Sequence, residues 1–153
     1  MDKLLRDFWT QQTAIQELYR NCIEPVCKKH EINPIEFGIL IHLHKYPTFN
    51  RGADIVKMKG LSKSYVSLSV KTLTKKELLV GEYKDGDRKN IYLHLLPSAE
   101  PIVEDGLEAQ KKFCQTLYKG FSEEEISQLT SFYNRINENV VGPRASKKQR
   151  TKS

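Results

Sequence analysis

The sequence predicts a mainly helical α+β fold in which three short helices and a two-stranded hairpin are flanked by long helices. Three observations predict it. Apolar residues recur at spacings of three and four along most of the 153 residues. Two short alternating runs occur at 78–83 and 90–95, and an Asp-Gly pair lies between them. The chain is 39% apolar and 29% charged, which suits one core, and it contains no long apolar run that would cross a bilayer.

The first expected element is one long helix over residues 3–29. Its apolar side chains recur at helical spacing from Leu4 to Ile23. Pro25 favours a kink or an early end there. A helix of about 25 residues is near 38 Å long, which exceeds what a domain of this size needs for its own core. Something else must therefore cover part of the apolar face.

Capping residues mark the next two helices. Asn33, Pro34 and Glu36 form a capping signal for a helix that runs to about Lys45, before Pro47. A short third helix is expected over 52–57 and ends before Gly60. Its inward side chains are expected to be Ile55, Val56 and Met58.

The fourth helix is capped by Ser62 and runs to about Lys76. Its inner face is formed by Val66, Val70 and Leu73. The sequence from 62 to 76 contains no acid, whereas a water-facing helix usually alternates acids with bases. Such a face suits a polyanion with hydrogen-bonding edges. The expected outer face carries Lys63, Ser64, Tyr65, Ser67, Leu68, Lys71 and Lys75.

The alternating runs 78–83 and 90–95 predict a hairpin, because glycine provides the positive φ that a tight Asp-Gly turn needs. The tip is expected to present Lys84, Arg88 and Lys89. Two strands alone are marginally stable in water, so this ribbon must pack on the helices that precede it.

Two more helices are expected after the hairpin, over about 98–118 and from the Ser122 cap onward, where Glu125 completes a capping box. The last helix has an apolar inner face of Ile126, Leu129, Phe132, Tyr133, Ile136 and Val140.

Charge is distributed unevenly along the chain. The net charge is 0 over residues 1–50, +5 over 51–95, −4 over 96–142 and +5 over 143–153. The basic tail 143–153 is expected to be disordered, and a solvated end is the more common role for such a segment. The first residues offer no secretory signal, and three cysteines are too few for a disulfide scaffold, so a cytoplasmic protein with reduced thiols is expected.

Three short helices followed by a ribbon is the order of a winged helix-turn-helix. In that arrangement the third helix enters the major groove of DNA with its N-terminus first, and the ribbon reaches the flanking backbone or the minor groove. This requires an outward polar face on the 62–75 helix, an apolar inner face, and cations at the ribbon tip. The sequence predicts all three.

Four segments carry a closer likeness. The stretches 53–56, 60–67, 70–79 and 85–89 resemble the MarR family of bacterial transcriptional regulators, and the likeness is continuous from about residue 33 to 105. The resemblance implies an obligate dimer of intertwined terminal helices. The implied organisation is a dimerisation helix at 1–32, a winged DNA-binding domain at 33–97, dimerisation helices at 98–142 and the basic tail at 143–153.

The resemblance also implies site residues. Arg88 would reach into the minor groove with Asp87 as its orienting partner, and the start of the 62–75 helix would contact DNA through Ser62, Lys63, Ser64, Tyr65 and Ser67. The lysines would mostly meet phosphates, which set affinity rather than sequence preference. These phosphate contacts are expected from Lys57, Lys63, Lys71, Lys75, Lys84 and Lys89.

The chain departs from the family pattern at four positions. Many members have arginine or another polar residue where this chain has Leu68, so either a thymine methyl is read there or the contact is absent. Glu77 replaces the glycine that usually ends the recognition helix. Leu96 replaces a capping threonine and Ala99 a glycine.

We therefore expect a sequence-specific, ligand-responsive repressor that binds a pseudo-palindromic operator as a homodimer. The alternative is a winged-helix adaptor for protein interactions. No motif of an enzyme, cofactor site or metal site is visible, and the redox roles of Cys22, Cys27 and Cys114 stay open. Side chains at helical spacing are more often core than ligand contacts. If the protein binds a small-molecule effector in a cleft, the candidate lining residues are Phe8, Trp9, Tyr19, Phe37, His42 and Tyr46.

Overall fold

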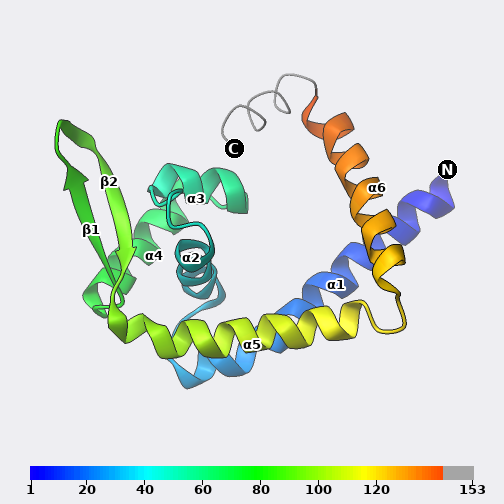
Figure 1. The fold of residues 1–153 in the computed structure, drawn as a ribbon, viewed down its shortest axis with the longest axis horizontal. Coiled ribbons are helices and arrows are strands. Elements are labelled where there is room, and N and C mark those ends of the chain that lie inside the picture. Colours follow the sequence, from blue (N-terminus) through cyan, green and yellow to red (C-terminus); the bar gives the residue numbers. More distant parts are fainter. Residues whose placement is uncertain (143–153) are drawn as a thin grey trace. The chain divides into compact units, whose positions relative to one another are not determined.

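The computed structural model describes residues 1–142, so the tail at 143–153 lies outside the described residues (Figure 1). The chain divides into two compact units, one over Met1–Cys114 and one that starts at Gln115. In the described part, none of the helices has a stretch long and apolar enough to span a bilayer. The elements are α1 (Asp2–Lys29), α2 (Pro34–Lys45), α3 (Gly52–Lys59), α4 (Lys63–Lys75), β1 (Leu79–Lys84), β2 (Asp87–Leu95), a 3₁₀ turn η1 (Pro97–Ala99), α5 (Glu100–Leu117) and α6 (Glu123–Val141).

Helix α1 is continuous for 28 residues, or about 42 Å. It passes through Pro25 and ends at Lys29, which confirms the predicted range of 3–29, and the alternative of an early end at Pro25 does not occur. Only the second half of the helix enters the core of the first unit, through Ile23, Val26 and Cys27. Most side chains of the first half are exposed, among them Trp9 at 62%. Part of its apolar face is thus uncovered, as the length of the helix predicts.

Helix α2 is the centre of the first unit and packs against α1, α4 and β2. The predicted capping box is confirmed. The Asn33 side chain accepts from the Glu36 amide at 2.9 Å, and the Glu36 carboxylate accepts from the Asn33 amide at 3.1 Å. The buried Glu36 carboxylate also lies 3.7 Å from the Lys76 ammonium, which offsets the cost of its burial.

Helix α4 lies against both α2 and α3, and α3 also contacts β2. Helix α3 extends to Lys59, two residues beyond the predicted end, and Gly60 then adopts a left-handed conformation. Ile55 is fully buried as predicted, whereas Met58 is exposed, so the inward direction predicted for Met58 is wrong. In α4 the Ser62 hydroxyl accepts from the Tyr65 amide at 3.2 Å, which confirms the predicted cap.

The end of α4 is strained because Glu77 adopts a left-handed conformation with φ of 57°. The Leu78 amide donates to the Leu73 carbonyl at 3.0 Å, and this closure of the helix end requires the left-handed residue. A residue with a Cβ pays about 1–2 kcal/mol for this conformation. Helix α4 thus ends at the position where the resemblance implies a glycine, but in this chain a glutamate adopts the left-handed conformation there.

We predict that Glu77→Gly raises the free energy of unfolding by about 1 kcal/mol, because glycine removes this strain at some cost in chain entropy. Urea unfolding at fixed protein concentration measures the change. Glu77→Ala is the control and should give no such gain, because alanine keeps the Cβ. A loss of stability in Glu77→Gly would show that the glutamate side chain compensates for the strain.

Strands β1 and β2 form an antiparallel ribbon, with Leu79 opposite Leu95 and a register shift between Tyr83 and Lys84. Strand β2 begins at Asp87, three residues earlier than predicted. The ribbon is tied to the chain before α3. The Leu93 amide donates to the Asn50 carbonyl at 2.8 Å, and the Asn50 side chain donates to the Leu93 carbonyl at 2.9 Å. As predicted, the ribbon does not stand alone.

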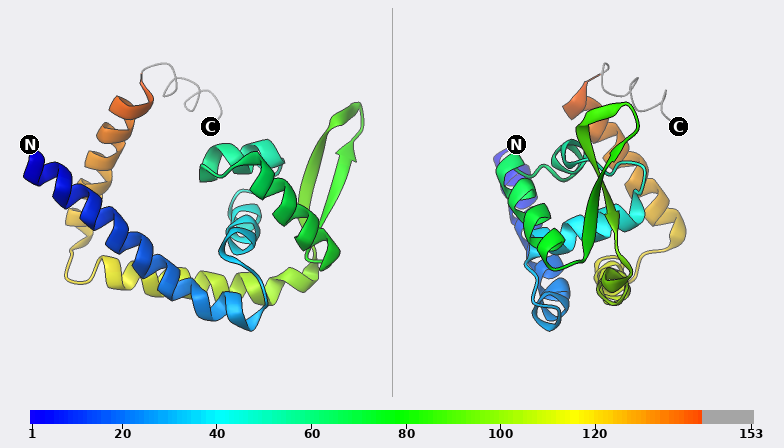
Figure 2. Two further views of the ribbon diagram at one scale, coloured as in Figure 1. Left: turned by 180° about the vertical axis from the view of Figure 1, so that it is seen from behind. Right: turned by 90° about the vertical axis from the view of Figure 1, so that its left-hand side faces the viewer.

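Helices α1 and α5 lie side by side in the first unit (Figure 2). The Lys29 ammonium and the His30 ring contact the Asp105 carboxylate at 2.8 and 2.7 Å. Helix α5 starts at Glu100, slightly later than predicted, because η1 precedes it. Of the three cysteines, Cys114 on α5 is exposed, Cys22 is half-buried and Cys27 is buried.

Helix α6 belongs to the second unit. The Ser122 and Glu125 capping box is confirmed, with the Glu125 carboxylate accepting from the Ser122 amide at 2.7 Å. None of the residues of α6 is buried. Most of the apolar face predicted to be internal is exposed, with Phe132 and Ile136 each 54% exposed, whereas Ile126 and Leu129 near the start of the helix are half-buried.

Candidate nucleic-acid interface

The outer face of α4 is exposed as the sequence predicts. Tyr65 is 60% and Leu68 62% exposed, while Val66 and Leu73 on the opposite side are buried. Ser69 is buried as well, which the pattern of aliphatic residues did not indicate. Hydroxyl groups and ammonium groups dominate the exposed face. Its members are Ser62, Lys63, Ser64, Tyr65, Ser67, Leu68, Lys71 and Lys75.

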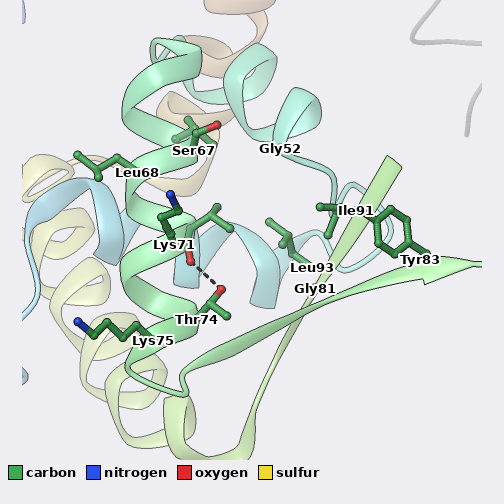
Figure 3. A pocket seen from close by; sticks show the side chains of 12 residues that line it. Gly52, Ser67, Leu68, Lys71, Thr74, Lys75, Gly81, Tyr83, Ile91 and Leu93 are labelled. Atoms are coloured by element: carbon green, nitrogen blue, oxygen red, sulfur yellow. Dashed lines mark hydrogen bonds between the residues drawn. The ribbon is translucent and has the colours of Figure 1, made fainter. Parts of the chain in front are cut away.

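A groove of about 940 Å³ separates α4 from the ribbon (Figure 3). Its ribbon wall is apolar and includes Tyr83, Ile91 and Leu93, whereas its α4 wall includes Lys71 and Lys75. Gly81 is required in that wall, because a Cβ there would lie only 2.6 Å from the Ile91 methyl Cγ2. The groove thus has an apolar wall facing a wall edged with cations.

At the ribbon tip the Asp87 carboxylate organises the turn. It accepts hydrogen bonds from the amides of Lys89 and Asn90 at 3.0 and 3.1 Å, from the Asn90 side chain at 2.9 Å and from the Tyr92 hydroxyl at 3.0 Å. These donors lower the pKa of Asp87 to about 2, with the Asn90 side chain the largest cause. The Lys84 ammonium lies 3.9 Å from the centre of the Tyr92 ring, a cation–π contact.

These contacts correct one expectation. Asp87 was expected to orient Arg88, but its carboxylate accepts hydrogen bonds from Lys89, Asn90 and Tyr92. Asp87 therefore holds the shape of the turn that presents Arg88, rather than holding the guanidinium itself. Arg88 and Lys84 are both exposed at the tip.

We predict that Asp87→Asn accelerates amide hydrogen exchange at Lys89 and Asn90 by about three- to tenfold, because a neutral amide is a weaker acceptor than a carboxylate. The folded pKa lies below the ordinary value near 4, so the carboxylate's contribution is present above that value and is lost as pH falls toward 2. Wild-type exchange protection should consequently be constant between pH 5 and 8, once the intrinsic pH dependence of exchange is removed. Asp85→Asn, in the same turn, is the control. Equal acceleration in both variants would contradict this role for Asp87.

Solved structures of the same architecture are found among regulators. Staphylococcus aureus MarR in complex with salicylate and kanamycin is 20% identical in sequence to this chain. The match covers 91% of this chain and 93% of that protein, with a TM-score of 0.73. S. aureus MepR in complex with DNA is 19% identical over 86% of this chain and 96% of its own, with a TM-score of 0.71. The chain has the MarR fold. An Escherichia coli MarR mutant bound to operator DNA, at 14% identity, covers 88% of this chain and 93% of its own with a TM-score of 0.68. No protein-family model matches the sequence.

Within this MarR fold, the six residues predicted to line an effector cleft are not gathered at one place. Phe37 and His42 are buried, and the His42 Nε2 lies 2.7 Å from the Phe49 carbonyl oxygen. The Tyr19 ring packs on Phe113, with 5.2 Å between the ring centres. Tyr46 is exposed next to His42, whereas Phe8 and Trp9 contact each other near the start of α1. Phe8 and Tyr19 are about 16 Å apart along α1.

Sequence reasoning missed several groups in this part of the MarR fold. The groove wall of Gly81, Tyr83, Ile91 and Leu93 was not predicted, although the period of two along each strand would place each pair on one face. Arg51 was missed too. It occupies the N-cap position of α3, and its guanidinium forms a bidentate contact with Asp54 at 2.9 and 3.0 Å, which lowers the pKa of that carboxyl.

Proposed function

We propose that the chain is a sequence-specific DNA-binding transcriptional regulator that acts as a homodimer on a pseudo-palindromic duplex. The observation that carries this proposal is the exposed, acid-free face of α4 beside a ribbon with cations at its tip. Major-groove edges offer donors and acceptors that hydroxyl groups can read, and phosphates attract lysines. That MepR and the E. coli MarR mutant are bound to DNA in structures of the same fold supports it.

In this proposal α4 enters the major groove with its N-terminus first. Ser64, Tyr65 and Ser67 read base edges, because they lie in the first two turns of the exposed face. The lysines at 63, 71, 75, 84 and 89 meet phosphates, and Arg88 enters the minor groove beside the site. Asp87 contributes by holding the turn of the ribbon rather than by contacting DNA.

The homodimer is supported by the uncovered apolar faces of both terminal helices. In α1 these side chains are Leu4, Leu5, Phe8 and Trp9, and in α6 they are Phe132, Tyr133, Ile136 and Val140. Exposed apolar surface of this extent marks an interaction site. A symmetric pair would present two copies of α4 to successive major grooves, about 34 Å apart.

A small molecule that regulates binding is part of the proposal, as is a repressor role. Salicylate is bound in the S. aureus MarR structure. An effector would act by preferring one spacing of the two α4 helices over another. The candidate contacts are the exposed members of the predicted set, Phe8, Trp9 and Tyr46, together with Tyr19. Fully buried Phe37 and His42 would act only through the packing around them.

Duplex binding at two salt concentrations tests the proposal. If six to ten phosphates are neutralised per dimer, affinity should fall by about 10³- to 10⁵-fold between 50 and 200 mM salt. Fluorescence anisotropy of a labelled 30-base-pair duplex gives both affinities. Weak binding with little salt dependence would contradict DNA recognition and would favour a protein-interaction adaptor with the same fold.

A further inference from the structure

Leu68 is unlike its neighbours on the outer face of α4. Within this helix, all of which the structure describes, it is the only exposed aliphatic side chain, and it is 62% exposed. Single exposed leucines are common on protein surfaces, so exposure alone says little. Its position is informative, because Leu68 lies in the middle of the α4 face that contacts DNA in the proposed function.

The direction of the side chain narrows its role. Side chains on a helix lean toward its N-terminus, so the Leu68 isobutyl group covers the turn that carries Ser64 and Tyr65. Figure 3 shows Leu68 directed away from Ile91 and Leu93, at the rim of the groove. Leu68 thus lines the groove only at its α4 rim, and its 62% exposure leaves the side chain available to a ligand of α4.

The major groove offers one apolar feature to such a side chain. The edges of the bases there are donors and acceptors, except for the C5-methyl group of thymine. Pressing an isobutyl group onto donors and acceptors would remove their water without replacing it, which is unfavourable. Contact with a methyl group removes apolar surface from water on both sides.

We propose that Leu68 contacts the C5-methyl group of one thymine in each half-site, so that the protein selects T·A at that position. This inference rests on the proposed function and adds to it which chemical group of the DNA Leu68 recognises. The polar hydroxyls of Ser64 and Tyr65 would read the neighbouring base pairs.

The test uses the full chain and begins by selecting bound duplexes from a random pool. In the selected sequence, each thymine is then replaced in turn by uracil, symmetrically in both half-sites, which removes only the methyl group. One buried methyl corresponds to about fourfold in affinity, so both half-sites together should lose about 15-fold at one thymine position. The Leu68→Ala variant should lose less than about twofold in affinity when the same thymine is replaced by uracil. Thr74→Ala is the control, because Thr74 is exposed on the same helix but lies outside the predicted set of DNA contacts, and this variant should keep the full sensitivity to loss of the methyl group.

The outcomes separate the two proposals. If duplexes are selected but no thymine is sensitive to loss of its methyl group, Leu68 does not read a methyl and this inference is overturned. Equal sensitivity of Leu68→Ala and wild type overturns it as well. If no sequence is enriched and duplex binding is insensitive to salt, the proposed function fails and this inference fails with it.

Discussion

Replacing Phe132 and Ile136 of α6 by glutamate is expected to convert a dimer into a monomer and to weaken operator binding by about 10²- to 10⁴-fold. Both side chains are half exposed in the chain, so the substitutions should not disturb its own core. In the proposed homodimer a second copy covers this face, so two charges there would have to be buried unpaired, which prevents association. The monomer then loses the gain from binding two linked half-sites at once. Sedimentation gives the mass, and anisotropy with the selected duplex gives the affinity.

The matched control places two glutamates on the opposite side of the same helix, at Ser131→Glu and Asn134→Glu. This variant adds the same charge to α6 but leaves its apolar face intact. It should remain dimeric and bind with nearly wild-type affinity. A dimeric Phe132→Glu/Ile136→Glu double variant, or a monomer that keeps full affinity, would remove α6 from the dimer interface.

Gly106→Val is expected to lower the free energy of unfolding by about 2–3 kcal/mol. Helix α5 passes so close to α2 that a Cβ on Gly106 would lie 2.7 Å from the Phe37 ring and 2.8 Å from the Ile41 Cδ1 methyl. Both neighbours are buried, so they have little room to move. Overpacking of this kind costs about 1–3 kcal/mol, and valine adds further bulk.

Gly52→Val is the control for this substitution. Gly52 also lies in a helix, but a Cβ there would have no neighbouring atom within 4 Å. Urea unfolding of both variants at one protein concentration should therefore show a clear loss for Gly106→Val and a change near zero for Gly52→Val. Equal losses would show that the cost of valine at Gly106 does not come from the contact between α5 and α2, because helix propensity alone favours valine over glycine.

Helix starts were predictable from sequence because their signals are local. Asn33, Ser62 and Ser122 each cap the helix that follows, and each forms the predicted hydrogen bond with the amide three residues on. The acid-free face of α4 was predictable for the same reason, since helical spacing alone separates its two sides.

Other features depend on contacts that spacing does not encode. Gly106 is a poor helix former by propensity, and only the approach of α2 explains it. The role of Asp87 depends on where β2 begins, because that start brings the Asn90 and Tyr92 side chains to its carboxylate. The apolar face of α6 follows from helical spacing, but spacing does not say what covers it, and none of the residues of α6 is buried among the described residues.

Methylation of bound DNA by dimethyl sulfate tests the placement of α4 most directly. The reagent modifies guanine N7 in the major groove and adenine N3 in the minor groove, so one experiment reports on both grooves. We predict two patches of N7 protection about one helical turn apart, with N3 protection beside them where Arg88 enters. Ser64→Ala/Tyr65→Ala should weaken the N7 protection alone. A bound complex without N7 protection, or with protection confined to the minor groove, would contradict the account.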